Sequence, residues 1–98
     1  MTKQDFIDAQ ENQFFNTIDK SLEKELQKEL ENFKNGTNNY KNRIRLFLSD
    51  AKANTITNEI REYICDKLIS KYKFVKEDII GITISSDYIS CIVVNLKF

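Results

Sequence analysis

The sequence contains no histidine, no proline and no tryptophan, and it has only two glycines among 98 residues. Histidine is the side chain that most readily changes charge near neutral pH, and many enzymes use it as a general acid or base. The two glycines lie far apart, so they do not build the glycine-rich loop that holds a phosphate. We therefore expect a protein that is not an enzyme, with no catalytic residue, no cofactor and no metal.

Cysteine is also scarce, with Cys65 expected on a helix and Cys91 on a strand. Two such residues make neither a disulfide framework nor a metal-binding signature, and without histidine no Cys–His nucleophile can form. We interpret both as small core hydrophobes in a reducing cytosol. The N-terminus lacks a signal-peptide pattern, and no run approaches the roughly 18 apolar residues that span a bilayer. The sequence thus predicts a cytoplasmic protein without a membrane partner.

Neither sign of charge dominates, because 15 basic residues balance 15 acidic ones. A neutral chain sets up no overall field that attracts nucleic acid, which argues against a nucleic-acid partner. Hydrophobic residues make up 41% of the chain, enough for one core, and the length predicts a single domain over residues 1–98. Asparagine, lysine and isoleucine exceed a third of the residues, a bias that A/T-rich codons produce and that suggests a bacterial or phage source.

The first third of the chain has the pattern of one long helix, residues 1–34. Thr2 and Asp5 resemble a capping box at its start, and Asn35 and Gly36 provide a stop where a left-handed residue is needed. At 100° per residue its apolar side chains fall within an arc of about 160°, so one helix face can bury them all. These are Ile7, Phe14, Phe15, Ile18, Leu22, Leu26, Leu30 and Phe33.

Residues 43–98 have the pattern of a β-α-β-β unit. Residues 43–48 alternate polar and apolar side chains with the two-residue period of a half-buried strand, although a helix start is the alternative. A second helix is expected from Thr55 or Thr57 to Tyr72, with apolar residues every four positions. Two further strands follow around a turn at Ser86 and Asp87. The sequence therefore predicts an α+β fold, in which a three-stranded mixed sheet of order 1-3-2 packs against the helices.

The pairing of the last two strands decides which residues face outward. With the turn at residues 86–87, the expected pairs gather six apolar residues on one face: Ile84 opposite Ile89, Ile82 opposite Cys91, and Ile80 opposite Val93. The last strand is apolar on its other face as well, so we expect it in the middle of the sheet. On that second face Ile92, Val94 and Leu96 remain without cover unless the long N-terminal helix or another chain lies across them.

An uncovered apolar face is typical of a surface that binds another protein. We therefore predict a non-enzymatic protein-interaction domain, either self-associating as an oligomer or serving as an accessory subunit, with Tyr88, Ile92, Val94 and Leu96 as its partner-binding residues. The alternative is a nucleic-acid-binding domain, because basic and aromatic side chains share the predicted outer sheet face, as in single-strand binders. The residues of this alternative face are Arg43, Arg45, Phe47 and Tyr88.

Overall fold

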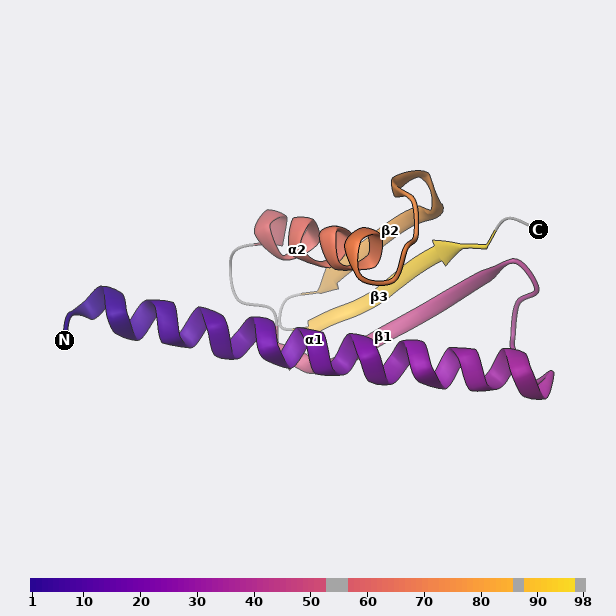
Figure 1. Cartoon of the computed structure of the whole chain (residues 1–98), viewed down its shortest axis with the longest axis horizontal. Coiled ribbons are helices and arrows are strands. Elements are labelled where there is room, and N and C mark those ends of the chain that lie inside the picture. The colour runs from indigo at the N-terminus through magenta and orange to yellow at the C-terminus, as the bar shows by residue number, and fades with distance from the viewer. Residues whose placement is uncertain (53–56, 86–87, 97–98) are drawn as a thin grey trace.

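The computed structural model describes residues 1–52, 57–85 and 88–96, with side chains described for residues 1–48, 58–83 and 91–96. Its main elements follow the expected order of helix, strand, helix, strand and strand (Figure 1). They are α1 (Lys3–Asn35), β1 (Arg43–Lys52), α2 (Thr57–Ser70), the short 3₁₀ helix η1 (Lys76–Asp78), β2 (Ile79–Ser85) and β3 (Tyr88–Asn95). The α+β class is confirmed, and residues 43–48 belong to a strand.

The ends of α1 are fixed by its own sequence. Thr2 Oγ1 accepts a hydrogen bond from the backbone N–H of Asp5 at 3.3 Å, and Asp5 Oδ2 accepts one from the backbone N–H of Thr2 at 2.9 Å. This capping box satisfies amides that the first turn of a helix leaves without partners. At the other end Gly36 has a φ of 72°, a left-handed conformation that glycine adopts without steric strain. Both predicted ends of the helix are confirmed.

The three strands form one sheet of order β1-β3-β2, as predicted. β3 is antiparallel to both of its neighbours, so the expected mixed sheet is wrong. The connections explain the difference. β2 and β3 form a hairpin, and the helical crossover from β1 brings the chain back so that β2 runs in the same direction as β1. The hairpin places β3 between β1 and β2, so β3 runs antiparallel to both of them.

A bulge in β3 overturns the predicted register. Ile84 lies opposite Ile89 as expected, but Ile82 lies opposite Ile92 and not opposite Cys91. Between these two pairs β3 advances by one residue more than β2, which is the mark of a bulge. The pairing of β3 with β1 shifts at the same place along β3. The expected turn at residues 86–87 lies outside the described residues.

The bulge decides which face of β3 meets the helices. Side chains alternate along a strand, so one extra residue turns everything beyond it to the opposite face. Ile92 and Val94, which we expected to face outward, therefore point toward the helices and are both 0% exposed. Alternation alone misplaces them, because no single residue identity marks the position of a bulge.

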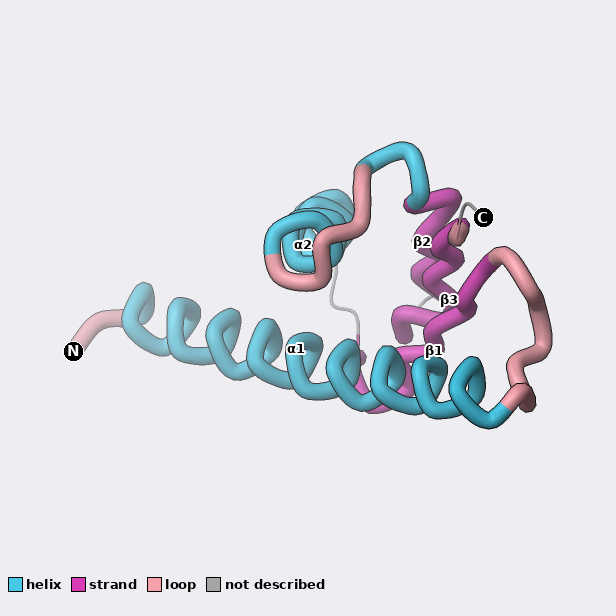
Figure 2. Tube along the Cα trace, turned by 45° about the vertical axis from the view of Figure 1, so that its right-hand side comes forward, coloured by secondary structure: helices cyan, strands magenta, loops and turns pink. Residues whose placement is uncertain are grey.

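Both helices cover the same face of the sheet, since their buried side chains join those of β1 and β3 in one core (Figure 2). Three members of the predicted ladder at steps of four, Ile60, Ile64 and Leu68, are buried in the core that α2 shares with the sheet and α1. Among the described elements, no helix lies over the opposite face. The buried members of the core are Ile18, Leu22, Ile44, Leu46, Leu48, Ile60, Ile64, Leu68, Ile92 and Val94.

α1 is much longer than the elements that it covers. Its 33 residues make a helix of about 50 Å at 1.5 Å per residue, and the longest extent of the chain is 51 Å. In Figure 1 the N-terminal part of α1 extends well past α2 and the sheet. We call residues 3–13 the overhang. All of them are exposed except Ile7, which is half-buried.

Candidate functional site

The sheet face away from the helices carries most of the predicted basic and aromatic residues. Arg43, Arg45 and Phe47 alternate with the buried residues of β1, and all three are exposed, Phe47 by 49%. Tyr88 begins β3 opposite Ser85, but its side chain lies outside the described part of the structure. Three of the four residues of the predicted nucleic-acid face are therefore shown to share one exposed strand face.

The two arginines of this face contact aromatic rings. The guanidinium of Arg43 lies 5.0 Å from the ring centre of Tyr40, and that of Arg45 lies 5.6 Å from the ring centre of Phe47. Arg45 also donates to the Tyr40 hydroxyl at 3.2 Å and to Cys91 Sγ at 3.9 Å. Among the described side chains, neither arginine forms an ion pair with a carboxylate. Their positive charges are oriented by π faces and stay open to an anionic ligand.

Three of the four predicted partner-binding residues do not line this exposed face, and the side chain of the fourth, Tyr88, lies outside the described part of the structure. Ile92 and Val94 belong to the core beneath the helices, and Leu96 is half-buried against the same core. A partner reaches Ile92 or Val94 only if the fold opens. The expected outward position of Ile92 and Val94 is wrong, because the bulge in β3 turns these side chains toward the helices. A protein-binding surface must therefore be sought among the large apolar side chains that are exposed.

An apolar groove lies at one end of the core, between the C-terminal half of α1 and the segment that links α2 to β2. Its volume is about 640 Å³, which is within the usual size of a ligand-binding site. Leu30 and Val75 stand on opposite walls and are 48% and 50% exposed. The apolar lining consists of Leu26, Leu30, Phe33, Ile44, Phe74, Val75 and Leu96.

The charged groups in the groove lining are acidic. Among the lining residues that the structure describes, Glu29 and Asp78 carry carboxylates and none is basic. Burial raises the pKa of Glu29, with a smaller contribution from Glu25, because the ionised carboxylate loses hydration beside apolar groups. The Asp78 carboxylate accepts from the backbone N–H of Val75 at 3.4 Å. The groove thus combines apolar walls with negative charge.

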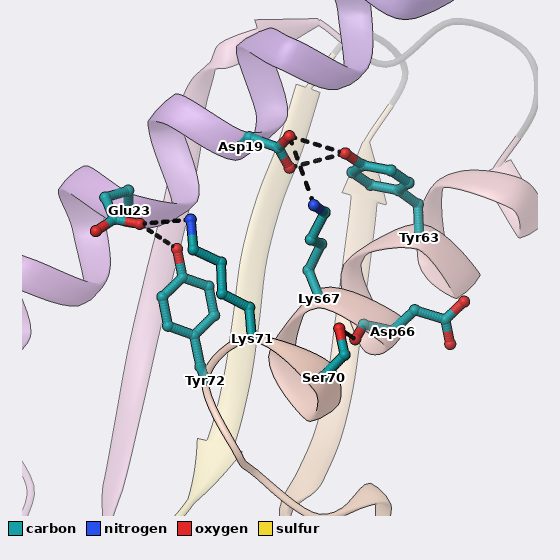
Figure 3. Close-up of polar contacts among 8 residues, drawn as sticks. All are labelled: Asp19, Glu23, Tyr63, Asp66, Lys67, Ser70, Lys71 and Tyr72. Atoms are coloured by element: carbon teal, nitrogen blue, oxygen red, sulfur yellow. Dashed lines mark hydrogen bonds and ion pairs between the residues drawn. The ribbon is translucent and has the colours of Figure 1, made fainter.

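A first polar cluster holds α2 against α1 (Figure 3). The Tyr63 hydroxyl lies 2.8 and 2.9 Å from the two carboxylate oxygens of Asp19, and Lys67 Nζ lies 3.9 Å from the same carboxylate. The Tyr63 ring stacks on Phe15 of α1 with 4.3 Å between ring centres. Burial, and then the hydrogen bond to Asp19, raise the pKa of Tyr63 to about 12, so its hydroxyl remains a donor at neutral pH.

A second cluster lies one turn further along α1, beside the groove. Glu23 accepts from the Tyr72 hydroxyl at 2.5 Å and forms an ion pair with Lys71 at 3.1 Å (Figure 3). The hydrogen bonds from Tyr72 and Lys71 lower the pKa of Glu23. Tyr72 also lines the groove. This cluster therefore fixes the segment that follows α2 at a set distance from α1, which keeps the two groove walls apart.

The described side chains assemble neither a metal site nor an activated nucleophile. No group of three cysteine, aspartate or glutamate side chains in the described part of the chain is placed to hold a metal. Cys65 and Cys91 are free and half-buried, so neither is the core residue that we expected. Burial raises the pKa of the Cys65 thiol, which keeps it protonated near neutral pH. None of the described helices has the length and apolar character needed to cross a membrane.

The groove and the role of Tyr40 do not follow from the sequence pattern. Leu30 belongs to the predicted buried arc of α1, whereas Val75 and Tyr40 lie outside every predicted helix and strand. One signal was present. Phe74 and Val75 form an apolar pair in an otherwise polar connection, and such a pair needs cover from elsewhere in the chain or from a partner.

The chain was compared with known proteins in three ways. No family model matches it, and neither a curated protein nor a solved structure matches it. The function must therefore be inferred from the geometry and chemistry of the two surfaces described above.

Proposed function

We propose that this protein is a non-enzymatic interaction domain that binds an apolar segment of a protein chain in the groove between α1 and the segment linking α2 to β2. The observation that carries the proposal is the open apolar groove of about 640 Å³, with Leu30 and Val75 half-exposed on its walls. Contiguous apolar surface of this kind is rare on a monomer unless it serves recognition. A groove beside a helix suits an amphipathic helix that inserts apolar anchors.

The charge of the groove restricts the partner further. Glu29 and Asp78 present carboxylates beside apolar walls, and Glu29 is held in surroundings that disfavour its ionised form. A lysine or arginine next to the apolar anchors of the partner stabilises the ionised carboxylate that burial disfavours. The proposed partner segment is therefore apolar and basic. We place the protein in the cytoplasm as part of this proposal, and its two free cysteines support a reducing compartment.

The proposal can be tested without knowing the natural partner. A display library of random peptides is selected on immobilised wild-type protein, and the enriched peptides are measured in solution against three proteins: wild type, Leu30→Lys and Gln27→Lys. Leu30→Lys places a positive charge on the groove wall, whereas Gln27 lies exposed on α1 outside the groove. We expect enriched peptides with apolar residues at helical spacing and at least one basic residue.

The two variants give the decisive comparison. Affinity for the enriched peptides should fall by about tenfold or more in Leu30→Lys, as for a residue at the centre of an interface. It should stay unchanged in Gln27→Lys, which carries the same added charge on the same helix. Peptides that bind all three proteins equally, or a selection that enriches nothing, would show that the groove is not a recognition site.

A second candidate function is the binding of single-stranded nucleic acid on the exposed sheet face. The favouring observation is that Arg43 and Arg45 stack on Tyr40 and Phe47 instead of pairing with described carboxylates. Aromatic rings and guanidinium groups on an open sheet are a recurring platform for bases and phosphates. The neutral charge of the whole chain works against strong binding there. We therefore rank this candidate second.

A further inference from the structure

The overhang of α1 is an amphipathic helix segment that the rest of the fold leaves exposed. Its most prominent apolar side chain, Phe6, is 63% exposed. At 100° per residue, Lys3, Phe6, Ile7 and Gln10 fall within an arc of about 100° on one side of the helix. We call this arc the plug face. Two acidic residues of the overhang, Asp5 and Asp8, lie on the opposite side, and the third, Glu11, lies just outside the arc, 40° from Ile7 at 100° per residue.

The plug face has the chemistry that the groove requires of its occupant. Its members are spaced i, i+3, i+4 and i+7, the spacing with which a helix inserts side chains into a groove. Phe6 and Ile7 supply apolar anchors, and Lys3 supplies a positive charge with no carboxylate on the same face. The groove offers apolar walls with the carboxylates of Glu29 and Asp78. The two surfaces are therefore complementary in both polarity and charge.

We infer that the groove of one copy of this chain binds the overhang of a second copy, so that the protein assembles with itself. This inference rests on the function proposed above and names its partner. The chain's own overhang does not reach its own groove, because both belong to one continuous helix. About 20 residues, or about 30 Å of α1, separate them. A second copy is thus the source of this segment.

The arrangement around α1 favours head-to-tail assembly. The plug face and the α1 residues that line the groove point in directions roughly 140° apart around the helix axis, at 100° per residue. A reciprocal pair of antiparallel helices needs both surfaces on one side of α1. Here they lie on nearly opposite sides and at opposite ends. Each copy therefore offers its overhang to one neighbour and its groove to another, a heterologous contact that propagates.

The contact is expected to be weak. A plug of about ten residues covers less area than the 1,200–2,000 Å² or so of a stable protein–protein interface, which places it among transient contacts. Assembly should therefore depend on concentration. The average mass should rise from the monomer value of 11.6 kDa in dilute solution past twice that value in concentrated solution. It should also fall as salt is added, because Lys3 and the groove carboxylates attract each other.

Four full-length variants test the contact by analytical ultracentrifugation. Phe6→Glu places a charge on the plug face, and Leu30→Lys places one on the groove wall. Each should remain monomeric at concentrations where wild type assembles. Their matched controls are Asn12→Glu, on the acidic side of the overhang, and Gln27→Lys, on α1 outside the groove. Both control positions are exposed, and both control variants should assemble like wild type. Circular dichroism should show all four variants folded.

Mixing the two disrupted variants gives the sharpest result. The Leu30→Lys copy has an intact plug face, and the Phe6→Glu copy has an intact groove. The mixture should therefore form a complex of two chains that does not grow further, because no second pair of intact surfaces remains. A mixture that stays monomeric, or a wild-type protein that stays monomeric at every concentration, would overturn the inference. The peptide selection then distinguishes the failure of the self-assembly inference from the failure of the proposed function. If the protein stays monomeric but its groove binds peptides, the proposed function stands and its partner is another protein. If the groove binds no peptide, both the inference and the proposed function fail.

Discussion

The hydroxyl of Tyr63 on α2 points at the carboxylate of Asp19 on α1, with oxygen–oxygen distances of 2.8 and 2.9 Å. The pair joins the two helices at the layer where both pack on the sheet, and the Glu23 cluster repeats the arrangement one turn later. Hydrogen bonds to a carboxylate are stronger than those between neutral groups. These contacts hold α1 beside α2, and the groove exists because α1 continues beyond the end of α2.

Removing the Tyr63 hydroxyl should weaken this junction measurably. We expect Tyr63→Phe to lower the free energy of unfolding by about 1–2 kcal/mol, because the ring still stacks on Phe15 while Asp19 loses a donor. Urea denaturation followed by circular dichroism measures the difference. Tyr40→Phe is the matched control, since it removes the same hydroxyl from an exposed ring, and it should change stability by less than about 0.5 kcal/mol. Equal effects in the two variants would contradict the role given to Tyr63.

The same contact predicts a dependence on alkaline pH. The pKa of Tyr63 rises from 10.0 to about 12 on folding, chiefly through burial. A group whose pKa is raised in the folded state contributes stability that is complete below its unfolded pKa and is lost as pH rises through its folded pKa. The stability difference between wild type and Tyr63→Phe should therefore persist to about pH 10 and disappear by about pH 12. Denaturation curves at a series of pH values check this, and a difference that grows across that range would exclude the assignment.

The elements of this fold could be predicted where local chemistry decides them. The capping box at Thr2 and the left-handed Gly36 end α1 where the sequence predicted, because both act within a few residues. The central position of β3 followed from its two apolar faces. Its register did not follow, because a bulge depends on how three strands fit together and not on the identity of one residue.

The candidate site was harder to predict than the fold. The groove needs Leu30 of α1 to stand opposite Val75 of the segment after α2, and these residues meet only once the tertiary structure has formed. Tyr40 joins the arginine face for the same reason, since its loop carries no periodic signal that would direct it there. By contrast, the outward position of Arg43, Arg45 and Phe47 follows from alternation alone and is confirmed.

The corrected register can be tested at one pair of neighbouring positions in β3. Ile92→Glu places an unpaired charge in the core, which costs about 4 kcal/mol or more and should abolish cooperative unfolding in a chain of this size. Val93→Glu introduces the same group on the opposite, partly exposed face and should leave the chain folded. Thermal denaturation of both variants distinguishes the registers. The register predicted from the sequence requires the reverse outcome, with Val93→Glu unfolded and Ile92→Glu folded.

The last prediction separates the two candidate functions through their response to salt. A protein that contacts phosphates releases counterions, so its affinity for single strands falls with a log–log slope of roughly 0.7 per contact. Arg43 and Arg45 supply two contacts, which limits the slope to roughly 1.4, and the neutral chain adds no surrounding positive field. We therefore expect no appreciable binding of a single-stranded oligonucleotide at physiological salt, measured by fluorescence anisotropy, and self-assembly that is unchanged in an Arg43→Ala/Arg45→Ala variant. If wild type instead binds tightly and in a salt-sensitive way, and the double variant loses that binding, the arginine–aromatic face is the functional surface. Two guanidinium groups on an open sheet reach such affinity only when bases also stack on Tyr40 and Phe47.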